Sequence, residues 1–356
     1  MCVMTSRALL DWYRTRARDL PWRSEPRDPY LVLVSEIMLQ QTQVDRVAPR
    51  FASFVERFQT FAALAAATQN EVLTAWSGLG YYRRARNLHR LARKVAAGTG
   101  YLPRTASDLE RLPGIGPYTA AAVASLAFGE AVPVLDGNVM RVGARVLAME
   151  TDPRLAEGRR RLETWIAGLM DGVPPGQVNE ALMELGAVVC RPAGPDCAAC
   201  PLSEDCGANA EGQPEAYPPP RRRRAVIALR WVAACCVDRE GAWLLRRIDE
   251  GPILQGLWLP PLAELEDQTD PLDEAKRLLP DVKSRYLIVG PAVRHHITHR
   301  KIDVVPVRVE AECFDPPSEN WQWVDPREPG VPTSSLLGKL VERFPFPDAL
   351  PERSHP

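Results

Sequence analysis

The chain has 356 residues, of which 46% are hydrophobic and 25% are charged, so it can form two globular domains. Its formal net charge is -1, which excludes binding of nucleic acid through overall positive charge, so any such contact must come from local clusters. No apolar run reaches the roughly 18 residues that span a membrane, and the first residues do not resemble a signal peptide. We therefore expect a cytoplasmic protein that does not enter the membrane.

Helical periodicity dominates residues 5–206, and no strand-like alternation occurs there. Asp28 followed by Pro29 is a typical helix start, and the apolar pattern of the helix that it predicts contains Glu36. An unpaired carboxylate is costly in an apolar environment, so Glu36 is expected to face a polar partner or to line a pocket.

Two further stretches of this region stand out. Thr42 and Asp45 form a near capping box, which predicts a helix start. Residues 76–86 combine a glycine-rich turn, two tyrosines and three arginines before another helix. Aromatic and basic side chains in this arrangement are typical of nucleic-acid contacts, although an ordinary surface helix has the same composition.

A short turn with two glycines joins two predicted helices at residues 112–118. Asp108 can cap the first helix, and Pro117 suits the first position of the second. Gly114 and Gly116 let the backbone approach a ligand, and the unpaired N–H groups of the new helix would face it. The turn is therefore a candidate phosphate-binding site, although alone such a turn is common.

Asp136 lies about twenty residues beyond this turn, just before another predicted helix, with Asn138 as its expected cap. Most aspartates at such positions are simple caps. Beside a turn that binds a DNA strand, however, the carboxylate of Asp136 is a candidate catalytic group.

Four cysteines occur within seventeen residues, in the pattern Cys190-x6-Cys197-x2-Cys200-x5-Cys206. In a chain without secretory features, this spacing indicates a metal centre. Zinc and a 4Fe-4S cluster can both use four cysteines. The single Cys-x2-Cys pair favours the cluster, because zinc sites more often show two.

The composition changes after the cysteines. A proline run and four consecutive arginines at residues 218–224 indicate a linker, and the hydrophobic period then becomes that of strands. Strands are predicted at 225–237, 242–246, 286–289 and 302–309, with a helix at 271–279. The predicted organisation is a helical domain at 1–189, a cysteine loop at 190–206, a linker at 207–224, an α+β domain at 225–345 and a tail at 346–356.

Five motifs in this order resemble the helix-hairpin-helix DNA glycosylases, and most closely the MutY-type adenine DNA glycosylases. They are residues 36–42, 78–82, 112–118 and 135–139 and the cysteine loop. The resemblance implies an all-α glycosylase domain with a 4Fe-4S cluster loop and a MutT-like (Nudix-fold) α+β domain. The second domain lacks the glutamate-rich Nudix metal box, so we expect it to recognise a lesion without hydrolase activity.

The resemblance implies a monofunctional enzyme of base excision repair. It would remove adenine paired with 8-oxoguanine or guanine in duplex DNA by hydrolysing the N-glycosidic bond of a flipped-out nucleotide, acting as a monomer at the nucleoid of a bacterial cytoplasm. The main alternative is a bifunctional pyrimidine glycosylase and lyase like endonuclease III. That branch carries a lysine nucleophile where this chain has Tyr118. An iron–sulfur DNA-binding module without catalysis is a second alternative.

The resemblance also implies residue roles. Glu36 would protonate the departing adenine and Asp136 would stabilise the sugar, while Tyr118 and Asn138 would support them. The family's lesion-contacting Phe-Ser-His turn is replaced by Ile297-Thr298-His299, and a monovalent cation is expected at the hairpin. The implied contacts with DNA or adenine are Trp22, Arg23, Leu39, Gln41, Thr42, Gly80, Tyr81, Gly114, Gly116, Glu180, Thr298 and His299.

Overall fold

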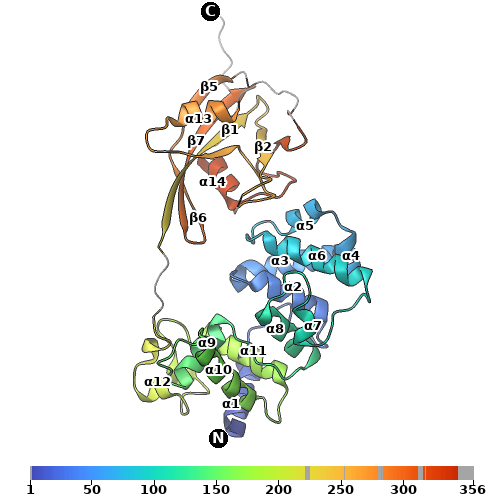
Figure 1. Ribbon diagram of the computed structural model, residues 1–356, viewed down its shortest axis with the longest axis vertical. Helices are drawn as coiled ribbons and strands as arrows, with labels where there is room; N and C mark the ends of the chain where they lie inside the picture. The colour runs from blue at the N-terminus through green and yellow to red at the C-terminus, as the bar shows by residue number, and fades with distance from the viewer. Residues whose placement is uncertain are drawn as a thin grey trace, which may run out of the picture. The chain divides into compact units, whose positions relative to one another are not determined.

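The computed structural model describes residues 2–220, 225–251, 253–279, 282, 284–311, 316 and 318–343 (Figure 1). The chain divides into two compact units, one of residues 1–68 and 83–222 and the other of residues 69–82 and 223–356. The four arginines 221–224 of the predicted linker and the predicted tail at 346–356 lie outside the described residues. None of the described helices has both the length and the apolar character needed to cross a membrane.

The first unit is helical, as predicted, since every strand among the described residues begins after residue 226. Its helices are α1 (Cys2–Arg16), α2 (Pro29–Leu39), α3 (Val44–Arg57), α4 (Phe61–Ala66), α6 (Arg83–Ala97), α7 (Ala106–Leu109), α8 (Pro117–Phe128), α9 (Gly137–Val146), α10 (Ala156–Leu169), α11 (Pro175–Val188) and α12 (Gly207–Ala210), with 3-10 turns η1 (Cys197–Ala199) and η2 (Pro214–Ala216).

Helix α2 lies in the middle of the first unit, packed against α3, α6 and α8. Its start is the predicted one, because the Asp28 carboxylate accepts a 2.8 Å hydrogen bond from the N–H of Tyr30 and Pro29 occupies the first turn. Nearly all of its residues from Tyr30 to Met38 are buried. Glu36 is therefore fixed in a packed interior, on a helix that contacts α8.

Two predicted helix caps are wrong. Helix α3 begins after Gln43 without a side-chain cap, because the Thr42 hydroxyl instead accepts a 3.0 Å hydrogen bond from Arg84. Helix α7 begins two residues before Asp108, where the Thr105 hydroxyl accepts from the N–H of Asp108. In the first case Arg84 occupies the Thr42 hydroxyl, and in the second Thr105 caps the helix in place of Asp108.

The second unit contains α5 (Gln69–Ala75) and an eight-stranded sheet with two further helices. The elements are β1 (Ile227–Val237), β2 (Trp243–Arg247), β3 (Trp258–Leu259), β4 (Leu262–Glu264), α13 (Pro271–Leu278), β5 (Ser284–Val289), β6 (Val293–Ile297), β7 (Arg300–Ala311), β8 (Trp321–Val324) and α14 (Ser335–Arg343). The central strands follow the order β3-β2-β1-β7-β5, with β1 parallel to β7 and the other pairs antiparallel.

The sheet separates two hydrophobic clusters, one packed by α14 and the other by α13. Alternation along β1 sends Cys235 into the first cluster and Cys236 into the second, so both cysteines are core residues. A mixed sheet with a helix on each face confirms the predicted α+β class. The short strands β3 and β4, β6, β8 and α14 were missed by the sequence reasoning.

Close packing of α9 against α11 depends on Gly186. A Cβ atom at this position would lie 2.6 Å from the Cβ of Asn138 and 3.1 Å from its backbone. Helix α11 therefore passes directly over the start of α9, where Asp136 and Asn138 are located.

We expect Gly186→Ala to destabilise the protein by about 1–3 kcal/mol, because the added methyl group has to displace the backbone of α9. The free energy of unfolding from denaturant titration measures this loss. Gly338→Ala is the matched control, since a Cβ at that helical glycine meets nothing within 4 Å; alanine there should stabilise by up to about 1 kcal/mol. Equal stability of the two variants would contradict the packing argument.

Candidate functional site

Glu36 is buried in α2 and has one polar partner at the start of α8. Its side chain is only 5% exposed, and its Oε2 atom accepts a 2.7 Å hydrogen bond from the Tyr118 hydroxyl. The pKa of Glu36 is raised to about 7: burial is the largest cause and the negative charges of Asp136 and Glu180 add to it, while the Tyr118 bond and the charge of Arg23 oppose them. The carboxyl is therefore a protonated acid in a substantial fraction of molecules near neutral pH.

Asp136, not Asn138, is the cap of α9. Its carboxylate accepts a 2.6 Å hydrogen bond from the N–H of Val139 and a 3.0 Å bond from the amide of Asn138. The prediction that Asn138 caps the helix is wrong, because the helix begins at Gly137, two residues earlier than a cap at Asn138 would place it. The pKa of Asp136 is raised by burial, and these bonds and the Arg141 charge offset only part of that rise.

The predicted catalytic residues Glu36, Tyr118, Asp136 and Asn138 interact with one another. Besides the two hydrogen bonds, Asp136 raises the pKa of Glu36 electrostatically. Burial, together with the negative charges of both carboxyl groups, raises the pKa of Tyr118 well above its ordinary value. The two acidic groups thus lie within electrostatic reach of each other, on elements separated by about a hundred residues.

A chain of hydrogen bonds connects this pair to the first cysteine. Asn138, which donates to Asp136, accepts a 2.9 Å bond from Arg141. The same guanidinium donates to the carbonyl oxygens of Cys190 and Gly186, at 2.9 and 2.8 Å. Arg141 was not singled out from the sequence. Its spacing, one helical turn after Asn138, was the available signal.

The turn before α8 has the geometry of an anion site. Gly114 adopts a φ of +80°, and a Cβ there would lie 2.4 Å from the Cβ of Asn87, so only glycine fits. Gly116 is the cap of α8 and offers no side chain to its first N–H groups, and a Cβ there would meet nothing within 4 Å. Pro117 occupies the first turn, as predicted. The open N-terminus can receive a phosphate oxygen.

Trp22, Arg23 and Glu180 have different environments. The Trp22 ring is 6% exposed and packs edge-on against Phe51, with ring centroids 5.4 Å apart, so it is part of the core. Arg23 donates a 3.0 Å hydrogen bond to Glu180. This ion pair continues into Arg18, Arg27 and Glu184, which the sequence reasoning missed. Glu180 and Glu184, four residues apart on an otherwise apolar helix, were the feature of the sequence that could have indicated this ion-pair network.

Three predicted DNA contacts have a left-handed backbone. Gln41, Tyr81 and Thr298 have φ values of 58°, 48° and 54°, and they are half of the six non-glycine residues with positive φ in the described chain. Such residues are uncommon and concentrate at functional sites. Gln41, Tyr81 and Thr298 are all exposed, as a contact with DNA requires.

The turn that carries Gln41 is held from α6. The Arg84 guanidinium donates to the carbonyl oxygens of Ile37, Met38 and Gln40 at the end of α2, and to the Thr42 hydroxyl. These carbonyls have no further helical partners, so the arginine closes the helix. Leu39 and Thr42 therefore flank a fixed turn. In the second unit, Gly80 precedes Tyr81 with a φ of 68°, and the Thr298 hydroxyl lies 3.3 Å from Nδ1 of His299.

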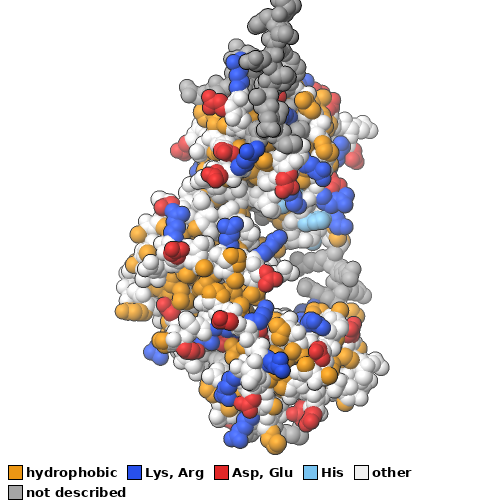
Figure 2. All heavy atoms as spheres, turned by 180° about the vertical axis from the view of Figure 1, so that it is seen from behind, with side chains coloured by type: hydrophobic (Ala, Val, Ile, Leu, Met, Phe, Trp, Pro, Cys, Tyr) orange, Lys and Arg blue, Asp and Glu red, His pale blue; other side chains and the backbone are white. Residues whose placement is uncertain are grey.

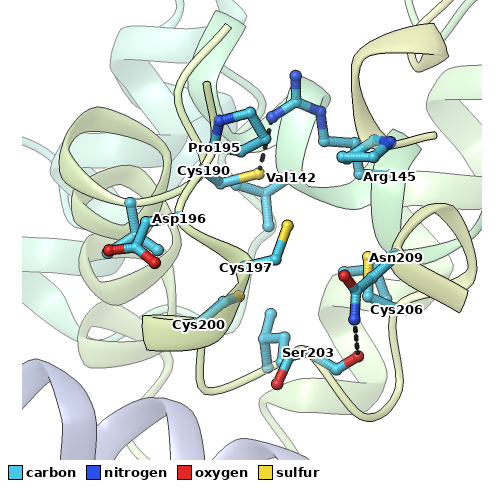
Figure 3. Close-up of a pocket in the computed structure, with 14 residues that line it drawn as sticks. Val142, Arg145, Cys190, Pro195, Asp196, Cys197, Cys200, Ser203, Cys206 and Asn209 are labelled. Carbon is cyan, nitrogen blue, oxygen red and sulfur yellow. Dashed lines mark hydrogen bonds between the residues drawn. The ribbon is translucent and has the colours of Figure 1, made fainter. Parts of the chain in front are cut away.

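The four predicted metal ligands lie around one pocket (Figure 3). Cys190, Cys197, Cys200 and Cys206 all line it, from the end of α11 to the start of α12. Burial raises the pKa of Cys200 to about 12, so this thiol stays protonated at neutral pH without a cationic centre beside it. Among the described residues, no group of three or more His, Cys, Asp or Glu side chains is arranged to hold a single metal ion.

Arg145 supports this pocket from α9. Its guanidinium is 2% exposed and donates a 3.3 Å hydrogen bond to the Cys190 sulfur. It also donates to the carbonyl oxygens of Arg191, Pro192 and Tyr217, at 2.7, 3.0 and 3.1 Å. Arg145 thus places a buried positive charge beside one of the four predicted sulfur ligands and ties the loop to α9.

Charge is distributed rather than segregated on the face shown in Figure 2. Lys and Arg side chains alternate with Asp and Glu over it, and no large patch of one sign covers that face. This agrees with the expectation that contacts with DNA depend on local groups, such as an open helix start, rather than on the field of the whole chain.

The chain is similar to known proteins of base excision DNA repair. The family model of the HhH-GPD superfamily base excision DNA repair protein matches residues 34–167. The chain is 46% identical over 210 residues to the adenine DNA glycosylase of Homo sapiens, covering 56% of this chain and 38% of that protein. It is 42% identical over 218 residues to that of Mycobacterium tuberculosis (strain CDC 1551 / Oshkosh), covering 61% of this chain and 71% of that protein.

A solved structure of a thermostable thymine-DNA glycosylase is 31% identical, with a TM-score of 0.53, and the match covers 58% of this chain and 95% of that one. The chain spans between 38% and 65% of the length of the first four curated relatives. The likeness in sequence covers Glu36, Tyr118 and Asp136, which the structure brings together. The chain belongs to the adenine DNA glycosylase family, within the HhH-GPD superfamily.

Proposed function

We propose that this protein is a monofunctional glycosylase that removes adenine paired with 8-oxoguanine or guanine in duplex DNA. The observation that carries the proposal is the buried Glu36 carboxyl, bonded to Tyr118 and within electrostatic reach of Asp136. Two carboxyl groups in unlike environments are what cleavage of a glycosidic bond through a cation-like transition state requires. The adenine specificity is inferred from the family.

The reaction begins when the adenine nucleotide leaves the base stack, at a cost of a few kcal/mol that a mispair lowers. Glu36 then donates its proton to the departing base. Because burial holds its pKa at about 7, the acid form is populated at neutral pH, and the carboxylate left behind can accept a proton from the attacking water. The Tyr118 hydroxyl fixes the orientation of Glu36.

Asp136 supplies the negative charge that faces the sugar cation. The hydrogen bonds from Val139 and Asn138 favour its ionised form and hold its carboxylate in one direction. Asn138 is held in turn by Arg141. Asp136 therefore stabilises the charge that develops at the sugar carbon as adenine departs.

Contacts with DNA are assigned to the exposed turns. The start of α8, behind Gly114 and Gly116, would bind the phosphates of the adenine strand, with a monovalent cation at the hairpin. Gln41 would fill the space that the base leaves, and Tyr81 would insert beside the opposite base. Their exposure and constrained backbones support this assignment. Leu39, Thr42 and Gly80 shape the same two turns.

The remaining assignments follow the resemblance. Arg23 and Glu180 would border the adenine, although their ion pair and the core position of Trp22 also have a structural role. Thr298 and His299, in the exposed turn between β6 and β7, would contact the oxidised guanine.

The cysteine loop fits a 4Fe-4S cluster. Four thiol groups line one pocket, a buried guanidinium stands beside one of them, and the donor set contains sulfur alone. Bound there, the cluster would cross-link residues 190–206 and hold this loop on α9 and α11. Arg145 and Arg141 would keep Cys190 in place beneath it.

The decisive experiment is base release from A:8-oxoguanine, A:G and A:T duplexes under single-turnover conditions. We expect release from the two mispairs and little from A:T. Asp136→Asn should lower the rate by at least about 10²-fold and leave mispair binding intact, because asparagine also caps a helix but carries no charge. Release from all three duplexes at one rate, or full activity in Asp136→Asn, would overturn the proposal.

Tyr118→Lys tests the alternative of a bifunctional lyase. An amine in place of the Tyr118 hydroxyl would lie beside Glu36, where it can attack the sugar carbon and form a Schiff base. We expect borohydride to trap this variant covalently on DNA and not the wild type. Tyr118→Phe is the control, since it removes the hydroxyl without adding an amine. Strong trapping of the wild type would favour the lyase.

Arg145→Met tests the cluster loop. The change removes the donor of four hydrogen bonds in a buried site, so we expect the free energy of unfolding to fall by about 2–4 kcal/mol and iron and sulfide content to decrease. The exposed Arg161 on α10 gives the control Arg161→Met. Unchanged iron content and stability in Arg145→Met would remove this residue from the support of the loop.

A further inference from the structure

Glu184 on α11 is a buried carboxylate that the proposed mechanism does not use. Its side chain is 1% exposed. Arg18 donates three hydrogen bonds to it, from the backbone N–H, Nε and Nη2, at 3.1, 2.7 and 3.0 Å, and Arg23 donates a fourth at 2.9 Å. These bonds hold the pKa of Glu184 below its ordinary value, so the group is ionised.

Arg23 connects this carboxylate to a second one. Its Nη2 bonds Glu184 and its Nε bonds Glu180 at 3.0 Å. On the other side, Arg27 bonds Glu180 at 2.7 and 3.3 Å. The result is an alternating row of ion pairs, in which Arg23 is the bridge and only the outer guanidinium of Arg18 is more than a third exposed.

Two members of this row, Arg23 and Glu180, act electrostatically on the proposed acid. Glu180 and Arg23 act on the proton affinity of Glu36 in opposite directions, Glu180 raising and Arg23 lowering its pKa. The other groups that face Glu36 are Tyr118 on α8 and Asp136 at the start of α9. A shift of the Arg23 guanidinium would therefore change the electrostatic environment of Glu36 without touching it.

We propose that Glu184 is a positioning residue of the proposed glycosylase site: it clamps Arg23 in the bridge to Glu180, and so fixes the opposing charges beside the acid Glu36. This inference rests on the proposed function, because Glu36 has to act as an acid. Buried ion pairs are seldom more stable than apolar replacements of equal volume. A gain in folding stability therefore does not explain why these ion pairs are buried, whereas the fixed charges that they place near Glu36 do.

The test compares Glu184→Gln, Glu184→Asp and the exposed control Glu157→Gln by the pH dependence of single-turnover adenine release. Release requires protonated Glu36, so the rate falls as pH rises through the pKa of Glu36. Glutamine keeps the shape of residue 184 but leaves Arg23 with excess positive charge. We expect the alkaline limb to move down by about half a pH unit, less than the roughly one to three units caused by an adjacent charge.

Glu184→Asp should keep the limb of the wild type, because it retains the charge although it shortens the side chain. A purely steric role predicts the reverse order, with glutamine normal and aspartate impaired. An unmoved limb in Glu184→Gln, or equal shifts in both variants, would overturn the inference.

Arg27→Gln provides an independent arm if Glu184→Gln does not fold. It leaves the charge of Glu180 less compensated, so the limb should move to higher pH; no movement would contradict the electrostatic coupling. Carbon-13 NMR titration of side-chain-labelled glutamate, with the Glu36 signal assigned by Glu36→Gln, should give the same order of variants without turnover. If the wild type releases no adenine, the proposed function fails, whereas the NMR titration still decides the role of Glu184.

Discussion

The hydrogen bond between Tyr118 and Glu36 determines how the rest of the site can work. A carboxyl group inside an apolar helix tends to stay protonated and can adopt several orientations, whereas a catalytic acid needs one orientation and a proton that can leave. The Tyr118 hydroxyl fixes the orientation of the Glu36 carboxyl by a direct hydrogen bond. The same bond stabilises the ionised carboxylate, so it lowers the pKa that burial raises and lets the proton leave. The charges of Asp136 and Glu180 raise the pKa of Glu36 further, and the charge of Arg23 lowers it.

The fold assembles these groups by helix packing rather than by loops. Glu36 lies on a helix buried on nearly every side, Tyr118 in the first turn of α8, and Asp136 at the start of α9, where its cap bond also serves to orient it. Helix starts present charged or polar side chains in fixed directions, because the cap geometry leaves little freedom. The missing side chain of Gly186 lets α11 approach α9 closely enough to complete the arrangement.

The proposed catalytic residues could be singled out from the sequence because each belongs to a local motif. A carboxylate in an apolar helix and an aspartate at a helix start are visible in a few residues of sequence. The ion pairs of Arg18 and Glu184, by contrast, join positions 166 residues apart, and no local pattern specifies which arginine meets which glutamate. The caps at Thr42 and Asp108 failed for a similar reason, since Arg84 and Thr105 supplied the competing partners.

Buried and half-buried arginines have two different roles in the first unit. Arg145 and Arg84 donate mainly to carbonyl oxygens, so they close chain ends and loops. Arg23 instead donates to two carboxylates and transmits charge. A planar guanidinium can make several fixed hydrogen bonds at once and stays charged when buried, which lysine does not. The arginines of this near-neutral chain therefore also act in its interior, where Arg23 orders charges beside the proposed active site.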